Sequence, residues 1–294
     1  MQIAITTWNA EGLGISGNSK LTQNYDNTWE ILIDHYTARL RETDGFREGK
    51  YLLMGMLAEA GTPPDPPQAA DVASGSLIKA TVKKTNYDYN YCWYGWSKGT
   101  TNLRCSLASM QLYPKPPDSW LSSYPMARFN TPHSLAEVTG KNLDTRPAAL
   151  SEFYSLARLF SLNVLLVHLP SGKKVRNLNI SILKDLMQKQ HGFFGVVPSV
   201  ILGDINIHIK GQTNDQIKTE LGIGPGSHWD VVRTNYPTQR SEGELDWALC
   251  YKCKGQAKIL GPVTPSVEAG SGKGFGVVAQ GISDHAVINY LITF

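Results

Sequence analysis

The chain has few cysteines and no long apolar run. Its 294 residues include four cysteines, too few for a small secreted domain built on disulfides. No stretch reaches the length of apolar residues needed to cross a bilayer, so we expect no direct membrane insertion. Low-complexity tracts are missing, and Met1 leads into a predicted strand without a signal-peptide pattern. These absences predict a globular chain with a single domain over residues 1–294.

Charge of one sign is also scarce. The formal net charge is only +3, which permits a polyanionic substrate without requiring one. The stronger basic signal is local, where Lys173, Lys174 and Arg176 lie together, and a solvated loop is the simplest interpretation of it. It is too short to predict a nuclear-entry signal.

The chain lacks a phosphate-binding loop of the P-loop type. The glycine-rich stretch 270–274 looks like one, but Val267 stands where the pattern requires glycine, and Gly274 where it requires serine or threonine. We therefore expect a flexible loop there, and the pattern of the P-loop nucleoside triphosphatases is absent.

The four cysteines do not form a zinc pattern. They are Cys92, Cys105, Cys250 and Cys253. The last two, in Cys-Tyr-Lys-Cys, resemble a redox or zinc half-site, but no second pair and no histidines at ligand spacing accompany them. Buried thiols or one disulfide are the favoured interpretations.

One stretch stands out among the features that are present. Residues 199–206 form a run of β-formers that ends in Gly203, Asp204 and Asn206, which predicts a buried strand with a polar tip. A period of two would place the carboxylate and the amide on one side, where their oxygens suit a divalent cation or a phosphate. Turn chemistry alone is the alternative, because Asp and Asn favour turns for local reasons.

Other polar residues stand at or beside the ends of predicted strands. They are Asn9, Glu59, His168, Asp246, Asp284 and His285. Adjacent Asp284 and His285 would point to opposite sides of an extended chain, so that one could bind a metal while the other reaches a substrate.

Hydrophobic periodicity predicts an α/β chain. Strands are expected at 2–7, 51–58, 77–83, 87–94, 104–113, 161–167, 199–206, 229–233, 245–251, 257–261 and 286–294, and helices at 27–41, 178–187 and 216–221. The run 51–58 has a helix as its alternative, but glycines and prolines downstream favour a strand. Residues 114–147, rich in Pro, Ser and Asn, are expected to form a long excursion with little regular structure. Aromatic residues at 87–94 predict packing, with base stacking as the minority interpretation.

Seven short motifs occur along the chain in the same order as in the endonuclease/exonuclease/phosphatase family, which has the deoxyribonuclease I-like fold. The chain therefore resembles that family. The motifs are Trp8-Asn9, Glu59-Ala-Gly61, Arg104, His168, Gly203 to Asn206, Leu245-Asp246-Trp247 and Ser283-Asp284-His285. The resemblance spans nearly the whole chain. Within the family, the segments 7–12, 59–63 and 238–246 are most similar to the catalytic B subunits of cytolethal distending toxins.

The resemblance implies a fold and an activity. The fold would be a four-layer sandwich of two mixed β-sheets with flanking helices. The activity would be Mg²⁺-dependent phosphodiester hydrolysis by a DNase that acts as the genotoxic subunit of a toxin similar to cytolethal distending toxin. A phosphoinositide phosphatase using the same site is the alternative, and a non-catalytic binding member of the family is a remote one.

The resemblance also implies roles for single residues. Glu59 would be the principal Mg²⁺ ligand, supported by Asn9 and Asp284, with Mn²⁺ or Ca²⁺ as substitutes. His285 would act as general base or as a stabiliser of the transition state, and Asp246 would orient it. His168 would contact the scissile phosphate, and Arg104 would neutralise charge on it. Asp204 and Asn206 would position the water and the phosphate.

The chain departs from the toxin pattern at several positions. Ile205 and Ile207 replace the Phe and Arg of Gly-Asp-Phe-Asn-Arg, so a phosphate contact is lost. Glu11 replaces a glutamine and could add a metal ligand or only a salt bridge. Leu202 and Ile207 argue against the inositol 5-phosphatases, which typically have Trp before this block and Arg after it.

The resemblance further implies partners and a location. DNA would be the substrate, and delivery subunits or a delivery domain would lie on another chain. We expect a secreted protein that is delivered into a host cell, with an intracellular location as the alternative.

Overall fold

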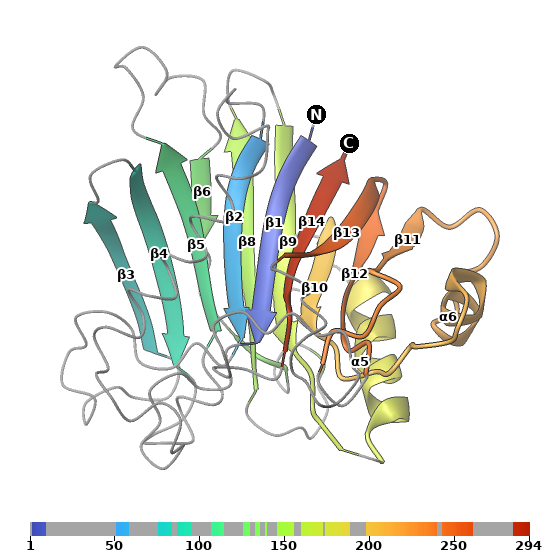
Figure 1. The fold of residues 1–294 in the computed structure, drawn as a ribbon. Helices are drawn as coiled ribbons and strands as arrows, with labels where there is room; N and C mark the ends of the chain where they lie inside the picture. Colours follow the sequence, from blue (N-terminus) through green and yellow to red (C-terminus); the bar gives the residue numbers. More distant parts are fainter. Residues whose placement is uncertain are drawn as a thin grey trace, which may run out of the picture.

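The computed structural model describes fourteen parts of the chain. They are residues 2–9, 51–58, 76–83, 87–95, 107–114, 126–129, 133–135, 139, 146–155, 160–172, 174–188, 198–239, 243–260 and 285–294. In these parts, two β-sheets face each other, with helix α5 on the outer side of the second sheet (Figure 1).

The first sheet has seven strands in the order β13-β14-β1-β2-β5-β4-β3. Their bounds are Lys254–Leu260 (β13), Val287–Thr293 (β14), Gln2–Asn9 (β1), Tyr51–Ala58 (β2), Leu107–Pro114 (β5), Tyr87–Gly95 (β4) and Ser76–Lys83 (β3). β1 and β2 are parallel and the other neighbours are antiparallel, so the sheet is mixed.

The second sheet follows the order β11-β12-β10-β9-β8-β6, with β7 paired to β8. Its strands are Trp229–Val232 (β11), Asp246–Tyr251 (β12), Val200–Asp204 (β10), Phe160–His168 (β9), Pro147–Ser155 (β8), Met126–Phe129 (β6) and His133–Ser134 (β7). β9 and β10 are parallel, while the remaining pairs are antiparallel. Both sheets are therefore mixed, as the family resemblance implied.

The continuous apolar run of β9 is explained by burial on both of its faces. Val164 and Leu166 point into the core between the sheets, and Leu165 and Val167 point into a second core beneath the helix. A strand covered on one side only would alternate apolar and polar residues. The run therefore fixes β9 as an interior strand.

Helix α5 (Arg176–Gln188) supplies the cover on the outer face of the second sheet. Its residues Ile182, Leu183 and Leu186 recur at helical spacing and pack with Trp247 of β12 in the second core. The shorter α6 (Asn214–Glu220) begins with a capping box between Thr213 and Gln216. Both helices were predicted, whereas the helix expected at 27–41 lies outside the described residues.

The expected excursion over 114–147 is wrong in part. The strands β6 and β7 lie inside it, and both pair with β8, which the sequence did not predict. Short edge strands tolerate a composition rich in Pro, Ser and Asn, because only one of their sides needs a hydrogen-bonded partner. Periodicity within the segment therefore does not reveal β6 and β7, because their pairing with β8 is what makes them strands.

The strand directions bring the ends of several strands to one edge of the sandwich. β1, β9 and β10 end there, and β12 and β14 begin there, at the lower edge in Figure 1. No helix in the described parts has both the length and the apolar character for a bilayer crossing.

Candidate active site

The ends of β9 and β10 place two polar residues opposite each other. Asp204 lies in register with His168, and the preceding Gly203 lies in register with Val167. Gly203 has a φ of +128°, and a Cβ there would collide with the carbonyl oxygen of Val167. Only glycine fits this close approach. The glycine predicted as a strand end is thus what allows β10 to deliver Asp204 beside β9.

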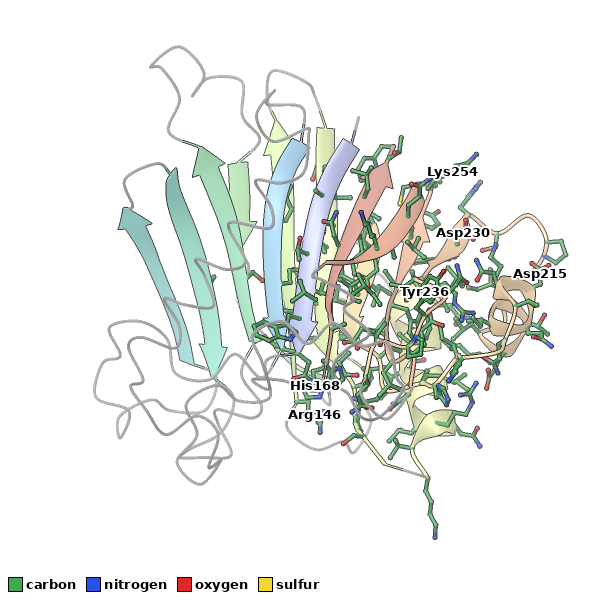
Figure 2. All side chains as sticks on the ribbon, in the orientation of Figure 1. Arg146, His168, Asp215, Asp230, Tyr236 and Lys254 are labelled. Atoms are coloured by element: carbon green, nitrogen blue, oxygen red, sulfur yellow. The ribbon has the colours of Figure 1, made fainter. Side chains whose placement is uncertain are left out.

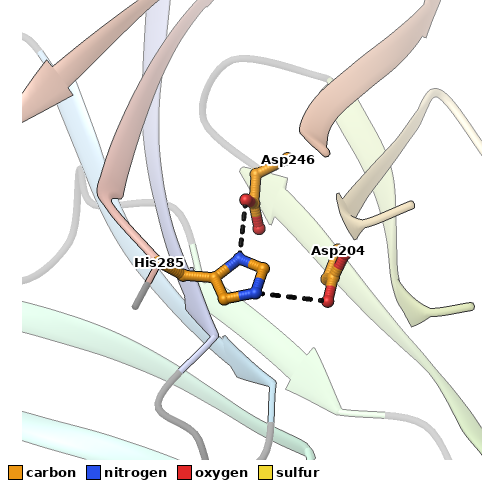
Figure 3. A group of neighbouring side chains, drawn as sticks. All are labelled: Asp204, Asp246 and His285. Atoms are coloured by element: carbon orange, nitrogen blue, oxygen red, sulfur yellow. Dashed lines mark hydrogen bonds and ion pairs between the residues drawn. The ribbon is translucent and has the colours of Figure 1, made fainter. Parts of the chain in front are cut away.

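His285 and Asp246 form a buried pair. Nδ1 of His285 lies 2.9 Å from Oδ2 of Asp246, as Figure 3 shows. Thr238 fixes both partners, since its hydroxyl accepts the Asp246 N–H at 3.0 Å and its carbonyl accepts the Ala286 N–H at 2.8 Å. The indole of Trp8 donates to the His285 carbonyl at 3.0 Å. His285 is therefore held by contacts from three other parts of the chain.

Asp204 lies at the centre of the cluster and is buried. Its Oδ2 accepts a hydrogen bond from Nδ2 of Asn9 at 2.9 Å. The same oxygen lies 3.4 Å from Nε2 of His168 and 3.9 Å from Nε2 of His285. One carboxylate thus faces both histidines and joins the first sheet to the second.

His168 has an arginine as its neighbour. Nη1 of Arg146 contacts Nε2 of His168 and also donates to the carbonyl of Leu169 at 3.0 Å. Burial holds the pKa of His168 well below its usual value, and the charges of Arg146 and then His285 lower it further. His168 is therefore neutral at neutral pH. Figure 2 shows Arg146 and His168 together near the lower edge of the sheets.

Arg146 was not predicted from the sequence. It stands immediately before β8, in the stretch that was expected to lack regular structure. An available signal was its place ahead of the apolar run Ala148 to Leu150, which makes it the polar neighbour of a strand end like the others. Arg146 was missed because β8, the strand that it precedes, was not predicted.

Asn206 lies next to Asp204 through a turn, and not through the strand alternation that the sequence predicted. Its φ is +52°, so the strand geometry ends at Asp204 and a period of two no longer applies. The backbone N–H of Asn206 donates to Oδ1 of Asp204 at 3.2 Å, an Asx-type turn, and its Nδ2 donates to the carbonyl of Leu169 at 2.9 Å. Turn chemistry and the candidate site thus use the same residues.

Asn179 connects the two loops behind the cluster, and it too was not predicted. This residue of α5 is fully buried. Its Nδ2 donates to the carbonyls of Pro170 at 2.8 Å and of Ile205 at 3.3 Å, with that of Asn206 at 3.4 Å. A single amide thereby ties the loop after His168 to the loop after Asp204.

The two isoleucines that depart from the family pattern are buried. Ile205 and Ile207 pack in the core beneath α5, and the carbonyl of Ile207 accepts a hydrogen bond from the Trp247 indole at 3.2 Å. The chain after Asn206 therefore turns into the protein, and neither isoleucine offers a phosphate contact.

A group of acidic and imidazole side chains could hold a cation. Ligand atoms of Asp204, Asp246 and His285 all lie within 4.8 Å of one another, and the three residues are buried. Carboxylate oxygens fit a hard divalent ion, and the nearby Asn9 carries an amide oxygen as well. The donor types thus fit a divalent cation, while Asp246 is already bonded to the His285 ring.

The structure brings together six of the nine site residues that the sequence predicted. They are Asn9, His168, Asp204, Asn206, Asp246 and His285. The other three, Arg104, Glu59 and Asp284, lie outside the described residues, as does Glu11. Their roles remain predictions.

Neither a protein-family model nor a curated protein matches the sequence. Solved structures do match. The cytolethal distending toxin of Haemophilus ducreyi matches at 15% identity over 98% of this chain and 97% of that chain, with a TM-score of 0.55. The toxin of Actinobacillus actinomycetemcomitans matches at 15% identity over 98% and 97%, with a TM-score of 0.52.

A second kind of neighbour is D. rerio TDP2 complexed with a single-strand DNA product. It matches at 13% identity over 100% of this chain and 99% of that chain, with a TM-score of 0.52. At such identities the likeness establishes the fold. The deoxyribonuclease I-like sandwich of two mixed sheets, expected from the sequence, is confirmed.

Proposed function

We propose that the protein is a Mg²⁺-dependent phosphodiester hydrolase that acts on DNA. The observation that supports this best is the buried arrangement of Asp246, His285 and Asp204 beside His168 and Arg146. Hydrolysis of a phosphodiester needs a group that accepts a proton from water and groups that stabilise charge on the phosphoryl oxygens. This cluster contains both kinds of group at one edge of the sandwich.

In the proposed mechanism, His285 accepts the proton. Its Nδ1 is bonded to the carboxylate of Asp246, which favours the tautomer with the proton on Nδ1 and the lone pair on Nε2. Nε2 is the nitrogen that faces Asp204, so water that attacks the phosphorus would give its proton to that atom. Asp246 then stabilises the imidazolium that results.

His168 and Arg146 would act on the phosphate. A neutral imidazole can donate a hydrogen bond to a phosphoryl or leaving oxygen without adding charge, and the lowered pKa of His168 keeps it in that form. The guanidinium of Arg146 supplies a permanent positive charge next to it. Removing one such donor typically slows an enzyme by about 10²- to 10³-fold.

The metal in this proposal would be held by Glu59, Asn9 and Asp284, of which Asn9 lies beside Asp204. A bound Mg²⁺ supplies Lewis-acid polarisation of a phosphoryl oxygen. Asn9 donates its amide N–H to Asp204, so the chain itself orients the amide group that carries the candidate ligand oxygen.

DNA is favoured over phosphoinositides on two grounds. A neighbour in fold is described with a single-strand DNA product, and Leu202 stands where inositol 5-phosphatases typically have tryptophan. We extend the proposal to a toxin role with delivery by another chain, because toxin structures are among the fold neighbours.

The test is nicking of supercoiled plasmid by the purified protein with Mg²⁺, with EDTA as a control. We expect conversion to open circles, its loss with EDTA, and a fall of about 10²- to 10⁴-fold in His285→Ala. His228→Ala is the matched control, because this histidine is exposed in the loop before β11.

The opposite outcome is equally clear. If folded wild type with Mg²⁺ does not nick plasmid, DNA hydrolysis is wrong as the main activity. Phosphate release from vesicles that contain a phosphoinositide then decides whether the same cluster serves a phosphatase.

A further inference from the structure

The far end of β12 carries two cysteines where the chain passes from one sheet to the other. Cys250 lies in register with Val200 of β10 and with Asp230 of β11. After Lys252, which has a φ of +55°, the chain enters the first sheet at β13. Cys253 directly precedes that strand. Cys250 therefore belongs to the second sheet, while Cys253 stands at the entry to the first, although only two residues separate them.

Backbone hydrogen bonds fix this crossing. The N–H of Tyr251 donates to the carbonyl of Ser199 at 2.8 Å, and the N–H of Lys252 donates to the carbonyl of His228 at 2.9 Å. Sγ of Cys253 lies 3.7 Å from the same Ser199 carbonyl. The backbone that carries both cysteines is therefore fixed.

Both thiols are buried in the core between the sheets, and they are not joined by a disulfide. Cys250 is 0% exposed and Cys253 is 8% exposed. Buried thiols, one of the two sequence interpretations, are thus what the structure contains.

Zinc does not account for the pair. In the described parts of the chain, the only group of three residues suited to a metal is the one at the opposite edge, and it contains no cysteine. A structural zinc site needs four ligands of the Cys or His type. The pair therefore has the composition of a redox dithiol.

The two thiols differ in acidity. The hydrogen bond from Cys250 lowers the pKa of Cys253, against the opposing effects of burial and the Asp230 carboxylate. The pKa of Cys250 is raised well above its usual value by its bond to Cys253 and then by burial. A thiolate forms more readily at Cys253, while Cys250 keeps its proton. This asymmetry is typical of a pair with one attacking and one resolving cysteine.

We propose that Cys250 and Cys253 form a redox site at which hydrogen peroxide produces a disulfide across the turn between β12 and β13. The Cys253 thiolate attacks one peroxide oxygen, the O–O bond breaks, and the released hydroxide takes a proton to become water, which leaves a sulfenic acid. Cys250 loses its proton and attacks that sulfur, the S–O bond breaks, and a second water leaves. Two thiols are oxidised and one peroxide is reduced.

The burial of the pair favours a small oxidant. Only Cys253 has any exposed surface, and it is slight, so peroxide has better access than a tripeptide disulfide such as oxidised glutathione. A soluble dithiol would reverse the reaction after local opening of the turn.

The position of the pair separates it from the hydrolase site. Cys250 lies four residues, about 13 Å, along β12 from Asp246. In Figure 2 the flanking residues Asp230 and Lys254 lie at the opposite end of the sandwich from Arg146 and His168. Oxidation is therefore expected to leave basal hydrolysis within about twofold, since the disulfide adds no group to the site.

The experiment is mass spectrometry of the folded full chain after reduction, desalting and peroxide treatment, with remaining thiols alkylated. The expected product is a 250–253 peptide that is lighter by two hydrogens and is restored by dithiothreitol. In Cys250→Ser a sulfenic acid should accumulate at Cys253 and be trapped by dimedone, whereas Cys253→Ser should form neither product. Cys92→Ala is the matched control, because that thiol is buried in the same core but lies on β4.

Wild type alone already decides the matter if a variant does not fold. Full alkylation of both thiols after peroxide, or oxidation that appears only in urea, would overturn the proposal and leave the pair as core packing. A dimedone adduct at Cys250 in place of Cys253 would overturn the assigned order. None of these readouts depends on hydrolysis, so the proposed function is tested separately.

Discussion

The two histidines of the site have neighbours of opposite charge. His285 is bonded to the carboxylate of Asp246 at 2.9 Å, whereas His168 contacts the guanidinium of Arg146. Asp204 lies near both rings, at 3.9 Å and 3.4 Å. A carboxylate favours the protonated form of an imidazole, and a guanidinium opposes it. Two copies of one side chain are thereby prepared for different tasks.

This difference comes from the strands that carry the partners. Asp246 begins β12 and faces the chain just before β14, while Arg146 precedes β8 and faces the end of β9. The half of the site on β12 and β14 sets a carboxylate against its histidine. The half on β8 and β9 keeps its histidine neutral and adds a fixed positive charge.

The largest effect should come from removing the carboxylate beside His285. Asp246→Asn should lower kcat for plasmid nicking by about 10²- to 10⁴-fold, because the amide neither stabilises an imidazolium nor fixes the tautomer. Asp215→Asn, on exposed α6, should be close to wild type. An unchanged kcat in the folded Asp246→Asn protein would remove the distinction between the two histidines.

Removing the arginine tests the other half. Arg146→Ala should lower kcat by about 10²- to 10³-fold, and it should raise the pKa of His168, although burial keeps that pKa below the usual value. The ring protons of His168, followed by NMR against pH, report the shift. Arg176→Ala, which removes the partner of Glu220 at 2.6 Å, is the control. A pKa of His168 that stays the same would mean that the guanidinium has no electrostatic effect there.

A smaller effect should follow from Asn179→Ala. Three carbonyls of the loops after β9 and β10 lose a buried donor, so the free energy of unfolding should fall by about 1–3 kcal/mol. Urea unfolding measures this, and Asn214→Ala, whose amide donates to Val231 at 3.3 Å near the surface, should lose less. Equal losses in the two variants would contradict the special position of Asn179.

The smallest effect is the pH dependence of stability. His168 is neutral when folded and has a usual pKa of 6.5, so below that pH the unfolded chain binds a proton that the folded chain does not. The free energy of unfolding should therefore fall with decreasing pH, by at most about 1.4 kcal/mol per pH unit from this residue. Above pH 6.5 this contribution is constant.

Urea unfolding at pH 7.5 and pH 5.5 isolates that contribution when wild type is compared with His168→Gln. Carboxylates affect both proteins alike, so only the difference between the two proteins matters. A difference that is the same at both pH values would show that His168 does not titrate differently on folding.

Much of this arrangement was predictable from the sequence, and the reason is burial. β9, β10 and β14 are apolar over most of their length because both sheet faces or a dense core cover them, and such runs are a strong signal. The polar tips Asp204 and His168 were identified because they interrupt these runs. Strands whose own sequence forms a long apolar run were therefore predicted correctly.

What escaped prediction depends on neighbours. β8 contains Pro, Ser and Glu, and it is recognisable as a strand only through its register with β9, such as Ala148 opposite Val167. The contact of Arg146 with His168 follows from that register. Asn179 was overlooked although it is a polar residue on the apolar face of a predicted helix, which is itself a signal for a buried hydrogen bond.

The pairing of β1 with β14 has a consequence for how the protein folds. Thr6 and Asn289 are 283 residues apart in sequence, yet their side chains share a hydrogen bond of 3.1 Å. Closing so long a loop is entropically slow, and non-local pairing of this kind lowers folding rates. A growing chain can assemble Asp204 beside His168 well before His285 has been synthesised. His285 should therefore join the cluster last, and the proposed hydrolysis should appear only with the final, slow step of folding.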